Sequence, residues 1–135
     1  DGVSYYNDSI GTSPTRTANG TLQLYDRKII LIAGGYDKQI PYDTLGPIIM
    51  DKVKTLILMG ATADKIEAAV KAAPNYCEQE IVILHANSME KAVALAKEQA
   101  QKGDIVSLSP ASASFDLYPN FEARGNHFKN IVNAL

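Results

Sequence analysis

The segment "TLILMGATADKIEAAVKAAPNYCEQEIVILHA", from Thr55 to Ala86, places a helical pattern between two short apolar runs. The runs "TLILMG" and "EIVILHA" are continuously apolar, as is typical of strands covered on both faces of a parallel sheet. Thr62 stands where a helix N-cap is expected, and Pro74 follows the last helical turn. Between them, apolar residues recur at helical spacing: Ile66, Ala69, Val70 and Ala73. A strand, a helix and a second strand in this order predict one βαβ unit.

The same alternation continues on both sides of this unit. Similar apolar runs occur at "KIILIAGG" (28–35) and "DIVSLSP" (104–110), and residues 1–6 at the start of the chain resemble a further short strand. Strands that alternate with helices at this spacing form right-handed crossovers. The sequence therefore predicts an α/β fold, a Rossmann-like, open, mostly parallel, doubly wound sheet flanked by helices.

Further helices are expected in three places. The segment "NSMEKAVALAKEQAQKG" (87–103) predicts a helix in which Asn87 and Glu90 can form a capping box. The end of the chain predicts a terminal helix from Pro119, a residue suited to the first helical position. Residues 15–25 fit either a turn or a helix that packs on the sheet, and we favour the helix.

Size and composition exclude several classes of protein. The 135 residues suit one domain, 1–135, and a net charge of -2 without a basic block is not the pattern of a nucleic-acid-binding protein. No apolar run approaches the roughly 20 residues of a membrane span, and the first residues lack a signal-peptide pattern. The lone Cys77 suits a reducing compartment. We expect a cytoplasmic monomer without nucleic-acid or membrane partners.

Three loops follow predicted strands, at the ends where open α/β sheets bind ligands. Gly34 and Gly35 allow a tight turn, and Lys38 then presents a mobile cation. In "SPASASFD" (109–116), small residues at a helix start leave amide N–H groups and serine hydroxyls free for an anion. The loop "NDSIGTSPT" adds further polar side chains: Asp8, Ser9 and Thr12. Together these loops predict a pocket for the carboxylates of a small acid.

Each of these features also has a purely structural explanation. Small residues at 109–115 can serve close packing between a strand and a helix. Lys38, taken by itself, is more simply a solvated loop lysine, and Asp8 a turn or N-cap residue. Sequence physics alone leaves both explanations open.

Signatures of other chemistries are missing from the sequence. His85 ends a predicted strand, but no Cys or His cluster has metal-ligand spacing, so no zinc site is predicted. Cys77 has no evident activating neighbour. Neither GxGxxG nor GxxxxGK[ST] occurs, so this chain is not expected to bind ATP by itself.

Four motifs stand out together: "NDSIGTSPTRT", "LIAGGYDKQIPYDTL", "KTLILMGATADKI" and "SLSPASASFDLYPNFEARGNHF". In order and spacing they resemble the C-terminal domain of the Mur ligase family, and most closely its D-glutamate-adding members. The resemblance covers nearly the whole chain, and the last motif is the most specific. It implies that 1–135 is the amino-acid-binding domain of a longer ligase, without the N-terminal UDP-binding and central ATPase domains. A start at Asp1 without methionine fits this expectation.

The resemblance implies an ATP-dependent acid–amino-acid ligase of bacterial peptidoglycan synthesis. In that family, the carboxylate of UDP-N-acetylmuramoyl-L-alanine is phosphorylated by ATP, and the amine of D-glutamate attacks the acyl phosphate. ATP and Mg²⁺ are then held mainly by the central domain. This chain alone would be inactive, with no catalytic residue and no metal ligand of its own.

The motifs also imply which residues contact the substrates. Those expected at D-glutamate are Thr12, Lys38, Ser114, Phe115 and Phe121. Lys38 would pair with a carboxylate, while Thr12 and Ser114 would donate hydrogen bonds to carboxylates. Asp8 resembles the acidic residue that meets the ATP ribose. Ile10 stands where some members carry a lysine, which puts a second cation in this pocket in doubt.

Two alternatives remain open at this point. The chain could be the C-terminal domain of another Mur ligase, or of a folylpolyglutamate-type ligase, that adds a different amino acid. It could also be a non-catalytic α/β module that binds a small anion for regulation or transport. Side chains of the 109–116 loop would decide the first alternative, and a P-loop upstream of Asp1 would exclude the second.

Overall fold

The computed structural model describes residues 4–7, 28–34, 45–60, 62–101, 103–108 and 121–134. Within these ranges, five strands form one sheet in the order β1-β5-β2-β3-β4, and every neighbouring pair is parallel. The strands are β1 (Ser4–Asn7), β2 (Ile29–Ala33), β3 (Val53–Leu58), β4 (Val82–His85) and β5 (Ile105–Leu108). The parallel sheet predicted from the sequence is therefore confirmed.

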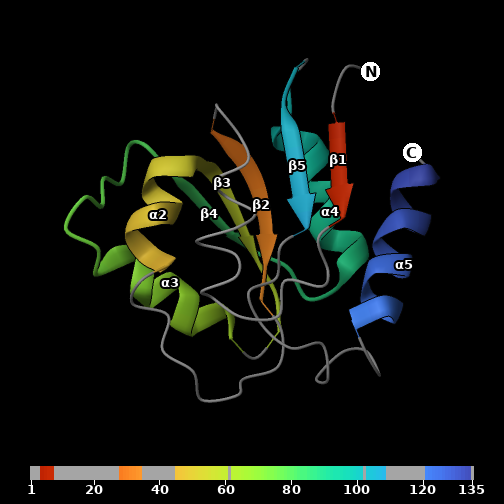
Figure 1. Ribbon diagram of the computed structural model, residues 1–135, viewed down its shortest axis with the longest axis horizontal. Coiled ribbons are helices and arrows are strands. Elements are labelled where there is room, and N and C mark those ends of the chain that lie inside the picture. The colour runs from red at the N-terminus through yellow and green to blue at the C-terminus, as the bar shows by residue number, and fades with distance from the viewer. Residues whose placement is uncertain are drawn as a thin grey trace.

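Helices cover both faces of this sheet (Figure 1). In the described residues they are α2 (Leu45–Lys52), α3 (Ala63–Lys71), α4 (Met89–Gln99) and α5 (Phe121–Asn133). Helices α2 and α3 pack on one face, whereas α4 and α5 pack on the other. The sheet is thus doubly wound, as expected for a Rossmann-like fold. None of these helices is long and apolar enough to cross a membrane.

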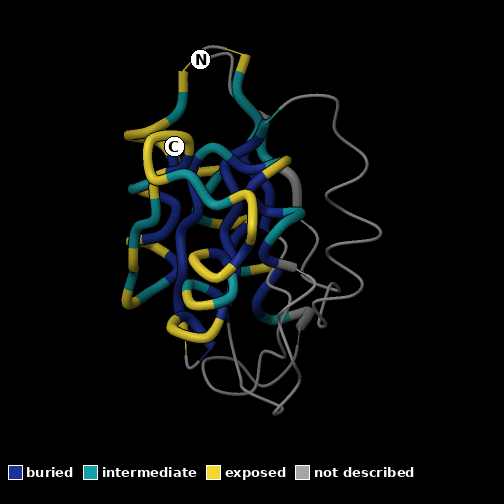
Figure 2. The backbone as a smooth tube through the Cα atoms, turned by 90° about the vertical axis from the view of Figure 1, so that its left-hand side faces the viewer, coloured by how far each residue is buried: buried dark blue, intermediate teal, exposed yellow. Residues whose placement is uncertain are grey.

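Strand β2 joins two separate hydrophobic cores. Ile29, Leu31 and Ala33 belong to the core beneath α2 and α3. Ile30 and Ile32 belong to the core beneath α4 and α5. Because successive side chains of a strand point to opposite faces, a strand covered on both sides must be apolar throughout. Figure 2 shows the buried backbone gathered in the middle of the molecule.

Strand β4 departs from this pattern. The run "EIVILHA" predicts a strand covered on both faces, but β4 lies at the edge of the described sheet and pairs with β3 alone. Val82 is 44% exposed, and Ile83 and Leu84 are half-buried. The prediction of full burial is wrong here because an edge strand lacks a neighbour on one side. His85, its last residue, is exposed as well.

Helix α2 is an element that the sequence patterns did not predict. Its first turn contains Gly46 and Pro47, which are ordinarily signals of a turn. Proline is tolerated there because the first N–H groups of a helix have no partner within the helix. A Cβ on Gly46 would lie 2.3 Å from the Ala69 carbonyl oxygen of α3. Glycine therefore permits the close packing of these two helices.

The start of α4 corrects another prediction. The N-cap is Ser88 and not Asn87, since the Ser88 hydroxyl accepts a hydrogen bond from the Lys91 N–H at 3.1 Å. Thr62 does occupy the N-cap position of α3, but its side chain makes no capping hydrogen bond. The helix expected at 15–25 lies outside the described residues, as does Pro119.

Candidate functional site

Three neighbouring strands end together where the predicted site loops begin. β5 lies between β1 and β2, and all three run in the same direction (Figure 1). Leu108 of β5 pairs with Asn7 of β1 and with Ile32 of β2. Adjacent strands are about 4.8 Å apart. The ends of these three strands therefore lie side by side, although they are far apart in the sequence.

The helices that follow β2 and β5 in the described part of the chain lie on opposite faces of the sheet. The next described helix after β2 is α2, on one face, and the next after β5 is α5, on the other. Neighbouring strands whose connections diverge in this way mark a topological switch point, outside which open α/β sheets bind ligands. By sequence, Lys38 follows β2 and Ser114 follows β5. The two loops that follow the strands at the switch point are thus two of the three loops that the sequence predicts to form the anion pocket.

Gly34 fixes the direction in which the chain leaves β2. Its φ is +115°, a conformation that residues with a side chain rarely adopt. A Cβ at this position would lie 1.9 Å from the carbonyl oxygen of Met59. The Met59 N–H donates to the Ala33 carbonyl at 3.0 Å, which holds the β2 and β3 ends together. Glycine is required here by backbone conformation and by space.

Most of the predicted contact residues lie outside the described part of the chain. These are Asp8, Thr12, Lys38, Ser114 and Phe115. Phe121 is the first residue of α5, and its side chain is not described. For the described residues, the structure brings together the strand ends from which these residues follow. Their predicted contacts remain predictions.

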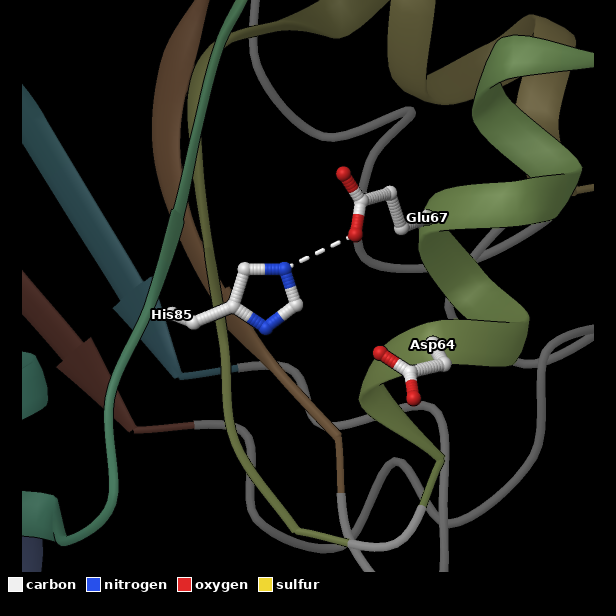
Figure 3. Close-up of side chains that lie close together, drawn as sticks. All are labelled: Asp64, Glu67 and His85. Atoms are coloured by element: carbon white, nitrogen blue, oxygen red, sulfur yellow. Dashed lines mark hydrogen bonds and ion pairs between the residues drawn. The ribbon is translucent and has the colours of Figure 1, made fainter.

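A polar cluster that the sequence analysis did not single out lies at the ends of β3 and β4. Asp64 and Glu67 project from α3 toward His85, the last residue of β4 (Figure 3). His85 Nε2 lies 2.8 Å from Glu67 Oε1, and one potential ligand atom from each of the three residues lies within 4.8 Å of the others. The signal in the sequence was an acidic pair at i, i+3 on a predicted helix, with a histidine at the end of the following predicted strand, 18 residues after Glu67.

Glu67 is held in its ionised form by its neighbours. Lys71 Nζ lies 3.0 Å from Glu67 Oε2, one turn further along α3. Hydrogen bonds from Lys71, and secondly from His85, lower the pKa of the Glu67 carboxyl. The hydrogen bond to Glu67 in turn raises the pKa of the Lys71 ammonium. The cluster therefore carries a carboxylate with a cation on one side and an imidazole on the other.

Comparison with protein families identifies the family of this chain. Residues 1–112 match the family model described as Mur ligase, glutamate ligase domain. The chain belongs to the Mur ligase family. The matched residues of this Mur ligase domain include all five described strands, and both sides of the switch point between β2 and β5.

Curated relatives extend the similarity to the whole Mur ligase domain. The chain is 58% identical, over its full length, to a UDP-N-acetylmuramoylalanine–D-glutamate ligase of Clostridium botulinum. It is 56% identical over its full length to the protein of the same name from Clostridium acetobutylicum. In both comparisons the chain spans 29% of the relative's length. Residues 113–135, beyond the family model, are therefore also shared with these relatives.

Proposed function

We propose that this chain is the D-glutamate-binding domain of a ligase that joins D-glutamate to UDP-N-acetylmuramoyl-L-alanine in peptidoglycan synthesis. The observation that carries the proposal is the 58% identity, over the full chain, to a relative named for this reaction. The fold supports it, because the ends of β1, β5 and β2 meet at a switch point suited to a small anionic ligand.

The proposed pocket takes its residues from the three segments that follow these strands. Lys38 forms an ion pair with a D-glutamate carboxylate, while the hydroxyls of Thr12 and Ser114 donate hydrogen bonds to carboxylate oxygens. Phe115 contributes its backbone N–H, and the ring of Phe121 covers the glutamate side chain. All of these residues except Phe121, the first residue of α5, belong to loops that follow strands of the sheet, and such loops commonly carry binding residues. Asp8 borders the ATP ribose at the edge of this domain.

The proposed role in the reaction is to position the amino acid. The carboxylate of UDP-N-acetylmuramoyl-L-alanine receives the γ-phosphoryl group of ATP, and ADP is released. The neutral amine of D-glutamate then attacks the carbonyl carbon of the acyl phosphate. The amide bond forms, and inorganic phosphate and a proton leave. Holding both D-glutamate carboxylates fixes the amine in line with that carbonyl, which makes the step effectively unimolecular.

The remaining parts of the proposed enzyme lie elsewhere in the ligase. The sequence has no P-loop, so ATP and Mg²⁺ are assigned to a central domain and the UDP group to an N-terminal domain. The isolated chain then has no ligase activity. A cytoplasmic, monomeric enzyme without nucleic-acid or membrane partners completes the proposal.

The test is made in the full-length ligase that contains this chain. Lys38→Ala removes the proposed ion pair, and we expect the KM for D-glutamate to rise by about 10- to 100-fold, since a charge-assisted hydrogen bond contributes about 1.5–3 kcal/mol. The matched control is Lys28→Ala. Lys28 immediately precedes β2, at its opposite end, and forms a 3.6 Å ion pair with Glu80 at the surface.

The outcome is read as a difference between the two lysine variants. An unchanged KM for D-glutamate in Lys38→Ala, or an equal rise in Lys28→Ala, would overturn the assignment of the pocket. L-Glutamate and the substrates of related ligases, offered to the same enzyme, test the choice of amino acid. Faster turnover of another amino acid than of D-glutamate would contradict the proposed substrate.

A further inference from the structure

The cluster of Asp64, Glu67 and His85 has the donor groups of a metal site. One carboxylate oxygen from each acid and a ring nitrogen of the histidine all lie within 4.8 Å of one another. Bonds to a common metal ion of about 2.0–2.2 Å place ligand atoms up to roughly 4 Å apart. Small rotations of the side chains, two of them exposed and Glu67 partly buried, would therefore bring all three to one ion. Figure 3 shows the His85 ring facing both carboxylates.

The fold holds the three residues together through two well-anchored elements. Asp64 and Glu67 are three residues apart on α3, and so lie on the same side of that helix. His85 pairs with Leu58 of β3, and the next N–H, of Ala86, donates to the Leu58 carbonyl at 2.8 Å. Because β3 leads directly into α3, the end of β4 is held beside the first turns of α3.

We propose that Asp64, Glu67 and His85 form a binding site for a divalent transition-metal ion, with Zn²⁺ as the best match. An imidazole nitrogen with two carboxylate oxygens is a mixed donor set that suits Zn²⁺ and its neighbours Co²⁺, Ni²⁺ and Cu²⁺. Mg²⁺ and Ca²⁺ favour sites built from oxygen alone. Three protein ligands leave a fourth position for water, and the exposure of Asp64 and His85 makes the site accessible.

The site is separate from the proposed D-glutamate pocket. The pocket lies at the ends of β1, β5 and β2, whereas the cluster lies at the ends of β3 and β4. The metal proposal therefore does not rest on the proposed substrate, and either can fail without the other.

The Lys71 ammonium competes with the proposed metal ion for the Glu67 carboxylate. Its Nζ lies 3.0 Å from Glu67 Oε2, so an ion at Glu67 would meet a positive charge close by. Removing that charge should tighten metal binding, because two like charges about 4 Å apart repel by about 1 kcal/mol even in water. A surface histidine that binds metal adventitiously, without Glu67, would not respond to Lys71 in this way.

The experiment is a calorimetric titration of the untagged chain with Zn²⁺, in a Cys77→Ser background that removes the free thiol. We expect one binding event, weakened at least about 10-fold by His85→Gln and likewise by Asp64→Asn. Lys71→Gln is expected to strengthen it about 5-fold. Mg²⁺ in large excess should not displace Zn²⁺. Amide NMR spectra with Ni²⁺ should show broadening at the start of α3 and the end of β4.

The matched control is His127→Gln. His127 is the other histidine of the chain, and its Nε2 lies 3.4 Å from Glu90 Oε1, but the described residues place it in no three-ligand group. This variant should leave Zn²⁺ affinity unchanged. No binding at millimolar Zn²⁺, an equal loss in both histidine variants, or no strengthening by Lys71→Gln would each overturn the proposal. Circular dichroism of each variant confirms that it is folded.

Discussion

Gly34 is the residue on which the start of the Lys38 loop depends. It has a positive φ and lies against the Met59 carbonyl, so the chain can turn out of β2 only without a side chain. At Tyr5, in contrast, a large side chain is accommodated, but burial of its hydroxyl costs stability. Its hydroxyl is buried and has no hydrogen-bond partner among the described residues. Tyr5 lies in β1 and Gly34 directly follows β2, and both strands border the proposed pocket.

Gly34→Ala is expected to destabilise the protein by about 2–4 kcal/mol, because the new Cβ adds a backbone clash to the cost of a positive φ. Urea denaturation followed by circular dichroism measures the loss. Gly103→Ala is the control, since Gly103 is exposed with a φ of +92° and reports the conformational cost, about 1–2 kcal/mol. Equal losses in the two variants would contradict the clash at Met59.

Tyr5→Phe is expected to leave stability unchanged or to raise it by up to about 1 kcal/mol, since the buried hydroxyl loses little when it is removed. Burial raises the pKa of the Tyr5 phenol. The unfolded chain then ionises first, so stability falls as the pH rises above the unfolded pKa of about 10. Between pH 9 and pH 11, the free energy of unfolding should fall less in the variant than in the unmodified chain, as measured by denaturation at both pH values. If Tyr5→Phe instead destabilised the protein at neutral pH, the Tyr5 hydroxyl would have a hydrogen-bond partner, and the prediction would be wrong.

Helix starts show how local sequence and tertiary contacts share control of an element. The periodicity of "NSMEKAVALAKEQAQKG" predicts α4 correctly, but Asn87 and Ser88 are both good N-cap residues. The structure selects Ser88, whose extended backbone presents the hydroxyl to the Lys91 N–H. Helix α2 shows the effect of tertiary contacts more strongly. Gly46 and Pro47 suggest a turn when the sequence is taken alone, whereas in the structure Gly46 allows α2 to pack closely against α3.

Ser88→Ala is expected to destabilise the protein by about 1 kcal/mol, through loss of the capping hydrogen bond at the start of α4. The neighbouring substitution Asn87→Ala removes a polar side chain that is exposed and outside the helix. It should change the free energy of unfolding by less than about 0.5 kcal/mol. Thermal denaturation of both variants makes the comparison, and a larger effect at Asn87 would contradict the assigned cap.

The whole molecule depends on two cores that share one sheet. Removal of either helix layer would expose alternate side chains of β2, so the layers stabilise each other through the sheet. Phe128 is the largest apolar side chain among the fully buried residues that the structure describes, and α5 packs through it onto the second core. The same helix begins at Phe121, which the proposed function assigns to the glutamate pocket.

Phe128→Ala is expected to cost about 3–5 kcal/mol, since it leaves a cavity beneath α5. Asn130→Ala, two residues further along the same helix at an exposed position, should have little effect. Urea denaturation of both variants measures the difference in their free energies of unfolding. Similar stabilities for the two variants would mean that α5 does not contribute to the core through Phe128.

The sequence by itself determined the class of fold, the family and most of the elements. Continuous apolar runs indicate the strands, because a strand covered on both faces has no exposed face for polar residues. Apolar residues at helical spacing indicate α3 and α4, because each helix buries one face against the sheet. The candidate pocket was predictable only as three loops, since local patterns do not say which strands are neighbours.

The tertiary structure alone decided the strand order and what it brings together. Placement of β5 between β1 and β2 makes the three loop starts adjacent, and placement of β4 at the edge leaves Val82 and His85 exposed. The same pairing of β4 with β3 brings His85 to Asp64 and Glu67. Spacing along the chain shows Asp64 and Glu67 as a pair on one helix, but it could not place His85 beside them, because that contact depends on the pairing of β4 with β3.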